Sequence, residues 1–385
     1  MTLLEFLRSL IATTGNVARL TELRTPVESV IFDHVFTNRI SRATDEISLA
    51  EITRVTKARP VISRGGHAIP LDVKNAATTR IEPLSIRLSD FLTGAQLNSL
   101  RHLYGMGGEN AEALVTAEID RIVMDLMRTT ELTRNALCAQ ALKGKIDFMM
   151  DSNGMTERYV IDFGTTQSLS LATLLDDESA TLVTLMNALR KMKKKITDAG
   201  YAGTPVILAG PNAWSTIANL VMATRSEGRM GAAIDGAVIS FMGYKIYLAD
   251  ETYNDKDVSG RDIVKDAIDT NSLCMVIPSL AELDYCAIDD LQGALQATPF
   301  FSKPVQIEDP SGIKIISESK PMPLIAPSSI CWATVTASEG ERSSLTIVNN
   351  ITVNTADQSE GQDVGTQSTD TQADAGTQAA AKSTK

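Results

Sequence analysis

Aromatic residues are scarce in this chain: 9 Phe, 7 Tyr and 2 Trp make up 5% of its 385 residues. With so few rings, the core must rest mainly on Leu, Ile, Val, Ala and Met. Long apolar runs are also missing, since no window approaches the roughly 18 apolar residues that span a bilayer. Glu5 and Arg8 interrupt the apolar stretch at the N-terminus, so no secretory signal peptide is visible. We expect a protein that folds in the cytoplasm and has no membrane segment.

Cysteine and histidine are too few and too scattered for most metal or redox chemistry. The cysteines lie singly among apolar residues and form no CxxC pair, which predicts reduced thiols in a core. The histidines share no metal-binding spacing, so no zinc site is expected. The residues concerned are Cys138, Cys274, Cys286, Cys331, His34, His67 and His102.

No catalytic or cofactor-binding motif is complete. Residues 143–145 resemble part of a phosphate loop, but Ile146 stands where Ser or Thr is required. Residues 255–260 resemble the first half of a calcium loop, yet its twelfth position would be Asp266 instead of Glu. We therefore expect no catalytic residue, no cofactor and no metal.

The charge balance is acidic, with a formal net charge of −11. An acidic chain repels phosphate, which disfavours a dedicated nucleic-acid binder. Lys193, Lys194 and Lys195 could contact phosphate, or could be a solvated face in the last turns of a helix, where cations are favoured. Weak contact with nearby DNA is compatible with this composition.

The most informative segment is 51–92, which is rich in Thr, Val, Ile and Pro and poor in helical periodicity. It reads as two extended runs around a bend at Ser63, Arg64, Gly65 and Gly66. Two runs of about 15 residues, at roughly 3.3 Å per residue, make a ribbon on the order of 45 Å long. A lone two-stranded ribbon is marginal in water. We expect another subunit to bury it, which predicts an assembling protein.

The strongest helix signal covers residues 109–142, with apolar residues at i, i+3 and i+4 spacing. Thr130, Thr133 and Arg134 interrupt the apolar stripe, so we expect the middle of this helix to be less buried. Lys143 and Gly144 are typical of a helix end. Beyond it, Asn153 and Gly154 predict a hairpin between strands at 145–150 and 158–163.

Alternating strand and helix patterns predict a compact α/β-like unit over 172–300. Its expected helices begin at Asp176 or Asp177 and near Trp214, and its strands lie at 205–209, 238–248, 272–277 and 283–288. Further strands at 313–318, 322–326 and 330–336 are expected to close the sheet. Residues 355–385 are mostly Thr, Gln, Ala, Asp, Gly and Ser, which predicts a disordered tail.

In this order, several segments resemble the lambda-type major capsid protein E family of tailed phages. They are residues 61–66 with the run to Leu88, 141–145, 160–164 and 319–335. The resemblance covers about residues 30 to 336, and the order and spacing of the segments carry it.

The resemblance implies an α+β Hong Kong 97-type capsid fold. It divides the chain into an N-terminal arm (1–50), an extended β-ribbon loop (51–92), a peripheral domain (93–171) with a spine helix (109–142), an axial domain (172–300), closing strands of the peripheral domain (301–350) and a disordered tail (351–385).

The resemblance also implies a function. The chain would self-assemble into hexamers and pentamers of an icosahedral phage head around double-stranded DNA, in the virion, after assembly in the host cytoplasm. Portal and scaffold or decoration proteins would be further partners, with DNA held only by weak non-specific contact. Candidate inter-subunit residues on the ribbon are Arg64, Gly65, Gly66, Arg80 and Arg87, although the arginines could also be simply solvated.

Other interpretations stay open. The same fold could form an encapsulin-like bacterial compartment that holds enzyme cargo, and a cytoplasmic enzyme with an unrecognised site is an alternative of another class. Some shells of this fold crosslink subunits through Lys and Asn. Lys57 or Lys74 and Asn349 or Asn350 have the right residue types, although lambda-type shells are typically not crosslinked.

Overall fold

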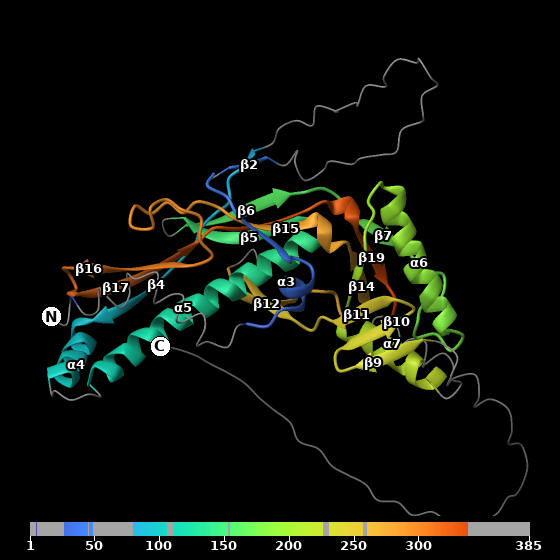
Figure 1. The fold of residues 1–385 in the computed structure, drawn as a ribbon, viewed down its shortest axis with the longest axis horizontal. Helices are drawn as coiled ribbons and strands as arrows, with labels where there is room; N and C mark the ends of the chain where they lie inside the picture. Colours follow the sequence, from blue (N-terminus) through green and yellow to red (C-terminus); the bar gives the residue numbers. More distant parts are fainter. Residues whose placement is uncertain are drawn as a thin grey trace, which may run out of the picture. The chain divides into compact units, whose positions relative to one another are not determined.

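The computed structural model describes Glu5 and residues 27–44, 46–48, 80–105, 111–152, 155–225, 231–256 and 260–337. The chain divides into two compact units, Met1–Ala337 and Ser338–Lys385, and every described residue lies in the first. The ribbon bend at residues 63–66, the four candidate crosslinking residues and the expected tail lie outside the described residues. Within them, the expected α+β class is confirmed (Figure 1).

The predicted long helix is present as α5, Ala111–Leu142, a single helix of 32 residues. It ends where predicted, because Gly144 follows with φ +83, a conformation that glycine adopts without strain. A Cβ on Gly144 would lie 2.5 Å from the carbonyl oxygen of Gly164. The expectation of a less buried middle is wrong, since Thr130 is 4% and Arg134 7% exposed.

One end of α5 packs on a three-stranded antiparallel sheet in the order β16-β17-β4, with α4 alongside (Figure 1). Leu92, Ile313 and Ile315 on the sheet share a core with Ile119 and Val123 on the helix. The predicted ribbon ended at Leu92, but strand β4 pairs with β17 along its whole length. The bounds are Ile86–Thr93 (β4), Gly94–Gly105 (α4), Phe301–Ile307 (β16) and Gly312–Ser319 (β17).

The predicted hairpin after α5 is confirmed as β5, Lys145–Ser152, and β6, Met155–Asp162. The strands pair from Lys145 with Asp162 to Ser152 with Met155, which leaves a two-residue connection. That length matches the connection expected from the Asn-Gly dipeptide.

A seven-stranded mixed sheet, in the order β7-β19-β14-β8-β11-β10-β9, forms a second core with α6 and α7. Strand β14, in the interior of this sheet, is buried on both faces. Leu273 and Met275 face the core shared with α6 and α7, and Cys274 and Val276 belong to the core shared with the C-terminal end of α5. The bounds are Gln167–Leu169 (β7), Leu182–Asp198 (α6), Val206–Ala209 (β8), Pro211–Arg225 (α7), Ala232–Asp235 (β9), Val238–Phe241 (β10), Tyr244–Leu248 (β11), Ser272–Val276 (β14) and Ile330–Thr334 (β19).

Two local expectations in this region are wrong. Helix α6 begins at Leu182 and not at Asp176, because the Asp177 carboxylate accepts a hydrogen bond from the Ser179 N–H at 2.8 Å and holds a turn there. The single strand expected at 238–248 is the hairpin β10–β11. It turns at Met242 and Gly243, whose φ angles are 49° and 84°.

The expected boundary at residue 300, between the axial domain and the closing strands of the peripheral domain, does not coincide with a boundary between sheets. Strand β19 lies between β7 and β14 in the seven-stranded sheet, although it was assigned to the peripheral domain. A third sheet, β1-β15-β18, joins a strand from either side of that boundary. The remaining bounds are Val30–His34 (α3), Asn38–Ser41 (β1), Ile47–Ser48 (β2), Arg80–Ile81 (β3), Thr252–Lys256 (β12), Asp262–Asp266 (β13), Ala281–Tyr285 (β15) and Pro321–Ile325 (β18), with short 3-10 turns at Pro278–Leu280 and Pro327–Ser329.

Candidate assembly site

The short helix α3 is held on the body of the subunit by two carboxylates. The Ser29 hydroxyl caps it by accepting from the Phe32 N–H at 3.2 Å, and donates to Glu251 Oε2 at 2.8 Å. The Val30 N–H donates to the other oxygen of Glu251, and the Val27 N–H reaches Glu131 Oε2 at 3.5 Å. Burial raises the pKa of the Glu251 carboxyl, although these hydrogen bonds oppose the shift. The segment that follows residue 26 is therefore fixed to α5 and to the β11–β12 connection.

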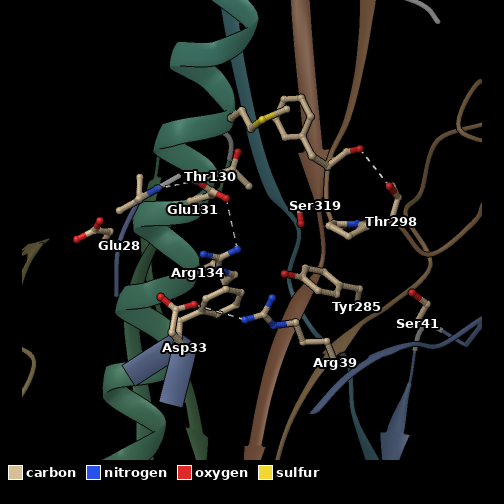
Figure 2. A pocket seen from close by; sticks show the side chains of 15 residues that line it. Glu28, Asp33, Arg39, Ser41, Thr130, Glu131, Arg134, Tyr285, Thr298 and Ser319 are labelled. Atoms are coloured by element: carbon tan, nitrogen blue, oxygen red, sulfur yellow. Dashed lines mark hydrogen bonds and ion pairs between the residues drawn. The ribbon is translucent and has the colours of Figure 1, made fainter. Parts of the chain in front are cut away.

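A recess of about 510 Å³ lies between α3, β1 and the middle of α5 (Figure 2). Arg134 on α5 and Arg39 on β1 both reach the Phe32 ring, at 3.5 and 3.8 Å from its centroid. Each guanidinium also has a carboxylate partner, Glu131 for Arg134 and Asp33 for Arg39, both at 3.6 Å. The lining is Val27, Glu28, Phe32, Asp33, Arg39, Ser41, Met127, Thr130, Glu131, Arg134, Tyr285, Thr298, Pro299, Phe300 and Ser319.

The two arginines of the recess contact a ring and carboxylates of the same subunit. The only hydroxyls of the recess, on Ser41, Thr130, Tyr285, Thr298 and Ser319, have no histidine or cysteine beside them in the lining. Two cations stacked on one ring contribute directional attraction that fixes a geometry. The arrangement joins the N-terminal segment, the long helix and the strands after residue 280 into one unit.

The five predicted inter-subunit residues are not brought together in the described part of the chain. Arg64, Gly65 and Gly66 lie outside it. Arg80 lies in β3, paired with β2, whereas Arg87 lies in β4, with Nε 3.9 Å from Oε2 of Glu318 on the neighbouring strand β17. Arg87 thus has a partner in its own subunit, and its role between subunits stays a prediction.

Sequence reasoning missed the cluster around Phe32. A usable signal was present: Thr130 and Arg134 interrupt the apolar stripe of an otherwise regular helix, and a buried charge in such a place requires a partner. The charge partner of Arg134, Glu131, is on the same helix, but Phe32 and the second arginine on its ring, Arg39, lie about a hundred residues away in sequence. Their proximity is set by the fold and not by any local pattern.

The remaining candidate groups are structural. All four cysteines are free and buried, as predicted, and burial raises the pKa of Cys138 to about 12 and of Cys331 to about 11. In the basic run, Lys194 pairs with Asp198 at 2.6 Å and Lys195 donates to the Ser168 carbonyl at 2.5 Å. Among the residues that the structure describes, no cluster of His, Cys, Asp and Glu could hold a metal ion. No helix in that part is long and apolar enough to cross a membrane.

Comparison with solved structures finds low-identity likenesses that span nearly the whole of each relative. A prophage protein of E. coli CFT073 is 15% identical with a TM-score of 0.48, over 84% of this chain and 99% of that one. The capsid of cyanophage A-1(L) is 11% identical with a TM-score of 0.44, over 82% and 94%. The SrpI encapsulin of Synechococcus elongatus PCC 7942 is 8% identical with a TM-score of 0.42, over 83% and 95%. No curated protein matches the sequence.

The family assignment rests on the sequence itself. The sequence model of the family described as "Phage major capsid protein E" matches residues 13–335. That range includes every segment on which the resemblance was based, and it runs from before α3 to the end of β19. The chain therefore belongs to the phage major capsid protein E family.

Proposed function

We propose that this chain is the structural subunit of a tailed-phage head, which self-assembles into hexamers and pentamers of an icosahedral shell around double-stranded DNA. The family match over residues 13–335 carries the proposal. The proposed arrangement is of the Hong Kong 97 type, with α5 as spine helix and the seven-stranded sheet with α6 and α7 as the main part of the axial domain. We propose that it acts mechanically and not as an enzyme, in keeping with a recess whose two arginines pair with carboxylates of the same subunit.

Assembly is proposed to depend on segments that leave the subunit. Of the N-terminal arm (1–50) and the ribbon (51–92), α3, β1, β2, β3 and β4 pack within the subunit. The rest of both segments would bury apolar surface on neighbouring copies, so that stability is shared through mass action. Arg64, Gly65 and Gly66 at the ribbon bend, with Arg80 and Arg87, are the proposed contact residues. Portal and scaffold or decoration proteins complete the proposed set of partners, and the site of assembly is the host cytoplasm.

Expression of the chain followed by sedimentation and electron microscopy tests this function. Closed shells of megadalton mass are expected. Deletion of residues 60–75 should leave a folded subunit with the circular dichroism of the intact chain that no longer assembles. A wild-type protein that stays a small oligomer at every concentration would contradict the proposed function. Shells that enclose an enzyme in place of DNA in the native host would instead indicate a compartment.

A further inference from the structure

The loop between β15 and β16 exposes two leucines to solvent. Leu291 is 86% and Leu295 53% exposed, and Leu291 is the most exposed large apolar side chain among the described residues. They lie four positions apart on one loop segment, residues 289–296, named here the Leu291 tip. Single exposed apolar residues are common on protein surfaces. Here two leucines of one short loop are both left uncovered by the rest of the subunit.

The Leu291 tip is held rigidly from beneath. Asp290 is only 3% exposed; its carboxylate accepts from the Gln292 N–H at 2.8 Å and pairs with Lys303 on β16. Backbone hydrogen bonds close the loop, from the Leu295 N–H to the Asp290 carbonyl at 3.1 Å and from the Ile288 N–H to the Gln296 carbonyl at 3.3 Å. The two leucines are thus presented by a fixed scaffold instead of a loose connection.

The backbone of the tip is strained. Ala294 and Leu295 both have φ of 55°, a region that residues with a Cβ seldom adopt. Backbone hydrogen bonds from the Ala294 N–H to the Leu291 carbonyl and from the Leu295 N–H to the Asp290 carbonyl, both at 3.1 Å, hold this turn. Strain of this kind persists only where surrounding structure enforces it, and it concentrates at functional positions. The loop's own hydrogen bonds sustain this strain, whereas its two leucines have no cover within the subunit.

The chemistry of the tip points to a protein partner. Residues 287–297 contain two aspartates and no Lys or Arg. Nucleic acid and anionic lipid surfaces are bound through cations, so neither fits. Two leucines also cover far less than the roughly 800 Å² per partner that a stable independent complex buries. So small a contact is useful only where other interfaces between the same molecules add to it, as in a lattice of identical copies.

We infer that the Leu291 tip docks on a second copy of this chain and forms an inter-subunit contact of the shell. This contact rests on the proposed function and adds to it a surface outside the N-terminal arm and the ribbon. The partner surface is apolar, and each copy both offers one tip and receives one.

The direct test is the double variant L291Q/L295Q of the full chain, with V264Q as matched control. Val264 is 68% exposed and lies on β13 of the two-stranded β12-β13 sheet, outside the Leu291 tip. We expect the double variant to raise the protein concentration needed for shell formation at least tenfold, with an unchanged thermal midpoint of the dissociated subunit. V264Q should assemble like the wild type. Normal assembly of the double variant beside normal wild-type shells would overturn the docking inference and leave the proposed function intact, whereas a wild type that forms no shells would overturn the proposed function itself.

A second measurement does not depend on whether the double variant folds. The four native cysteines are buried, so L291C introduces a single accessible thiol. We expect maleimide to label this thiol at least tenfold more slowly in assembled shells than in dissociated subunits. Equal labelling rates in the two states would show that the tip remains free in the shell and would refute the contact.

Discussion

Replacement of Arg134 by Met should destabilise the subunit far more than the same change at an exposed arginine of the same helix. Arg134 lies in the middle of α5, with a side chain that is 9% exposed beside a Glu131 side chain that is 12% exposed. Methionine keeps most of the aliphatic stem, so R134M removes the charge and the ring contact while it retains the packing. The decrease in unfolding free energy should therefore measure how much the Arg134 charge and its ring contact stabilise the subunit.

The expected magnitude follows from the geometry. Removal of one partner from a fully buried pair costs about 3–5 kcal/mol, but a separation of 3.6 Å and residual exposure favour the lower end of that range. The lost stacking on Phe32, at 3.5 Å from the ring centroid, adds about 1 kcal/mol. We expect R134M to lose about 4 kcal/mol of unfolding free energy. Adding E131Q should restore about 1–2 kcal/mol, because the buried carboxylate charge is then removed as well.

Urea unfolding of dissociated subunits, followed by circular dichroism, measures both effects. The matched control is R121M, since Arg121 is also on α5 and pairs with Glu118 at 2.9 Å, but its side chain is 58% exposed. A surface pair of this kind contributes about 0–1 kcal/mol, so R121M should cost well under 1 kcal/mol. Equal losses of unfolding free energy for R134M and R121M would refute the view that burial strengthens the Arg134–Glu131 pair. The same conclusion would follow if adding E131Q to R134M restored no stability.

Three further predictions concern other parts of the subunit. G144A should cost about 2–3 kcal/mol in urea unfolding, because it combines a positive φ with a close approach, whereas G236A at φ +55, with no atom within 4 Å of its Cβ, should cost only about 1 kcal/mol. The raised pKa of Glu251 means that the folded subunit binds more protons than the unfolded chain. Its contribution is therefore complete below the unfolded pKa of about 4.5 and is lost as pH rises through the folded pKa, so the stability of E251Q should rise relative to that of wild type as pH increases above about 4.5. Parallel pH profiles would contradict this. Because burial raises the pKa of Cys138 to about 12, its thiol should stay unreactive towards a disulfide reagent at pH 8 until the subunit unfolds, and rapid native labelling would show that the core is open.

Elements with a local signal could be predicted from the sequence. The long helix is such a case, because its apolar spacing persists for many turns and Gly144 ends it with a φ that only glycine adopts easily. The β5–β6 hairpin is another, since a two-residue Asn-Gly connection determines both turn and register. In the same way, the cysteines could be placed in the core from their apolar neighbours.

Long-range pairing could not be predicted, because it leaves little trace in local periodicity. Strand β19 is buried along most of its length, so its pattern is equally compatible with any central position in any sheet. Strand β4 alternates weakly and has Arg87 and Asp90 on it, which resembles an exposed ribbon until β17 is found beside it. The candidate site depends on the same kind of information, since Phe32 meets Arg134 only after the chain has folded.

The interruption in the middle of α5 has a physical reason once both cores are considered. At about 1.5 Å per residue, a helix of 32 residues is roughly 48 Å long, which is longer than either core that it serves. Its N-terminal half packs on the β16-β17-β4 sheet, and its C-terminal end packs in the core that contains β15 and β18. Between the two cores, Thr130, Glu131 and Arg134 lie where the helix borders the recess. Polar residues there have partners, because Phe32 on α3 supplies the ring that Arg134 contacts and Val27, just before α3, donates its backbone N–H to Glu131. The break in the apolar stripe is therefore the position at which the N-terminal segment binds.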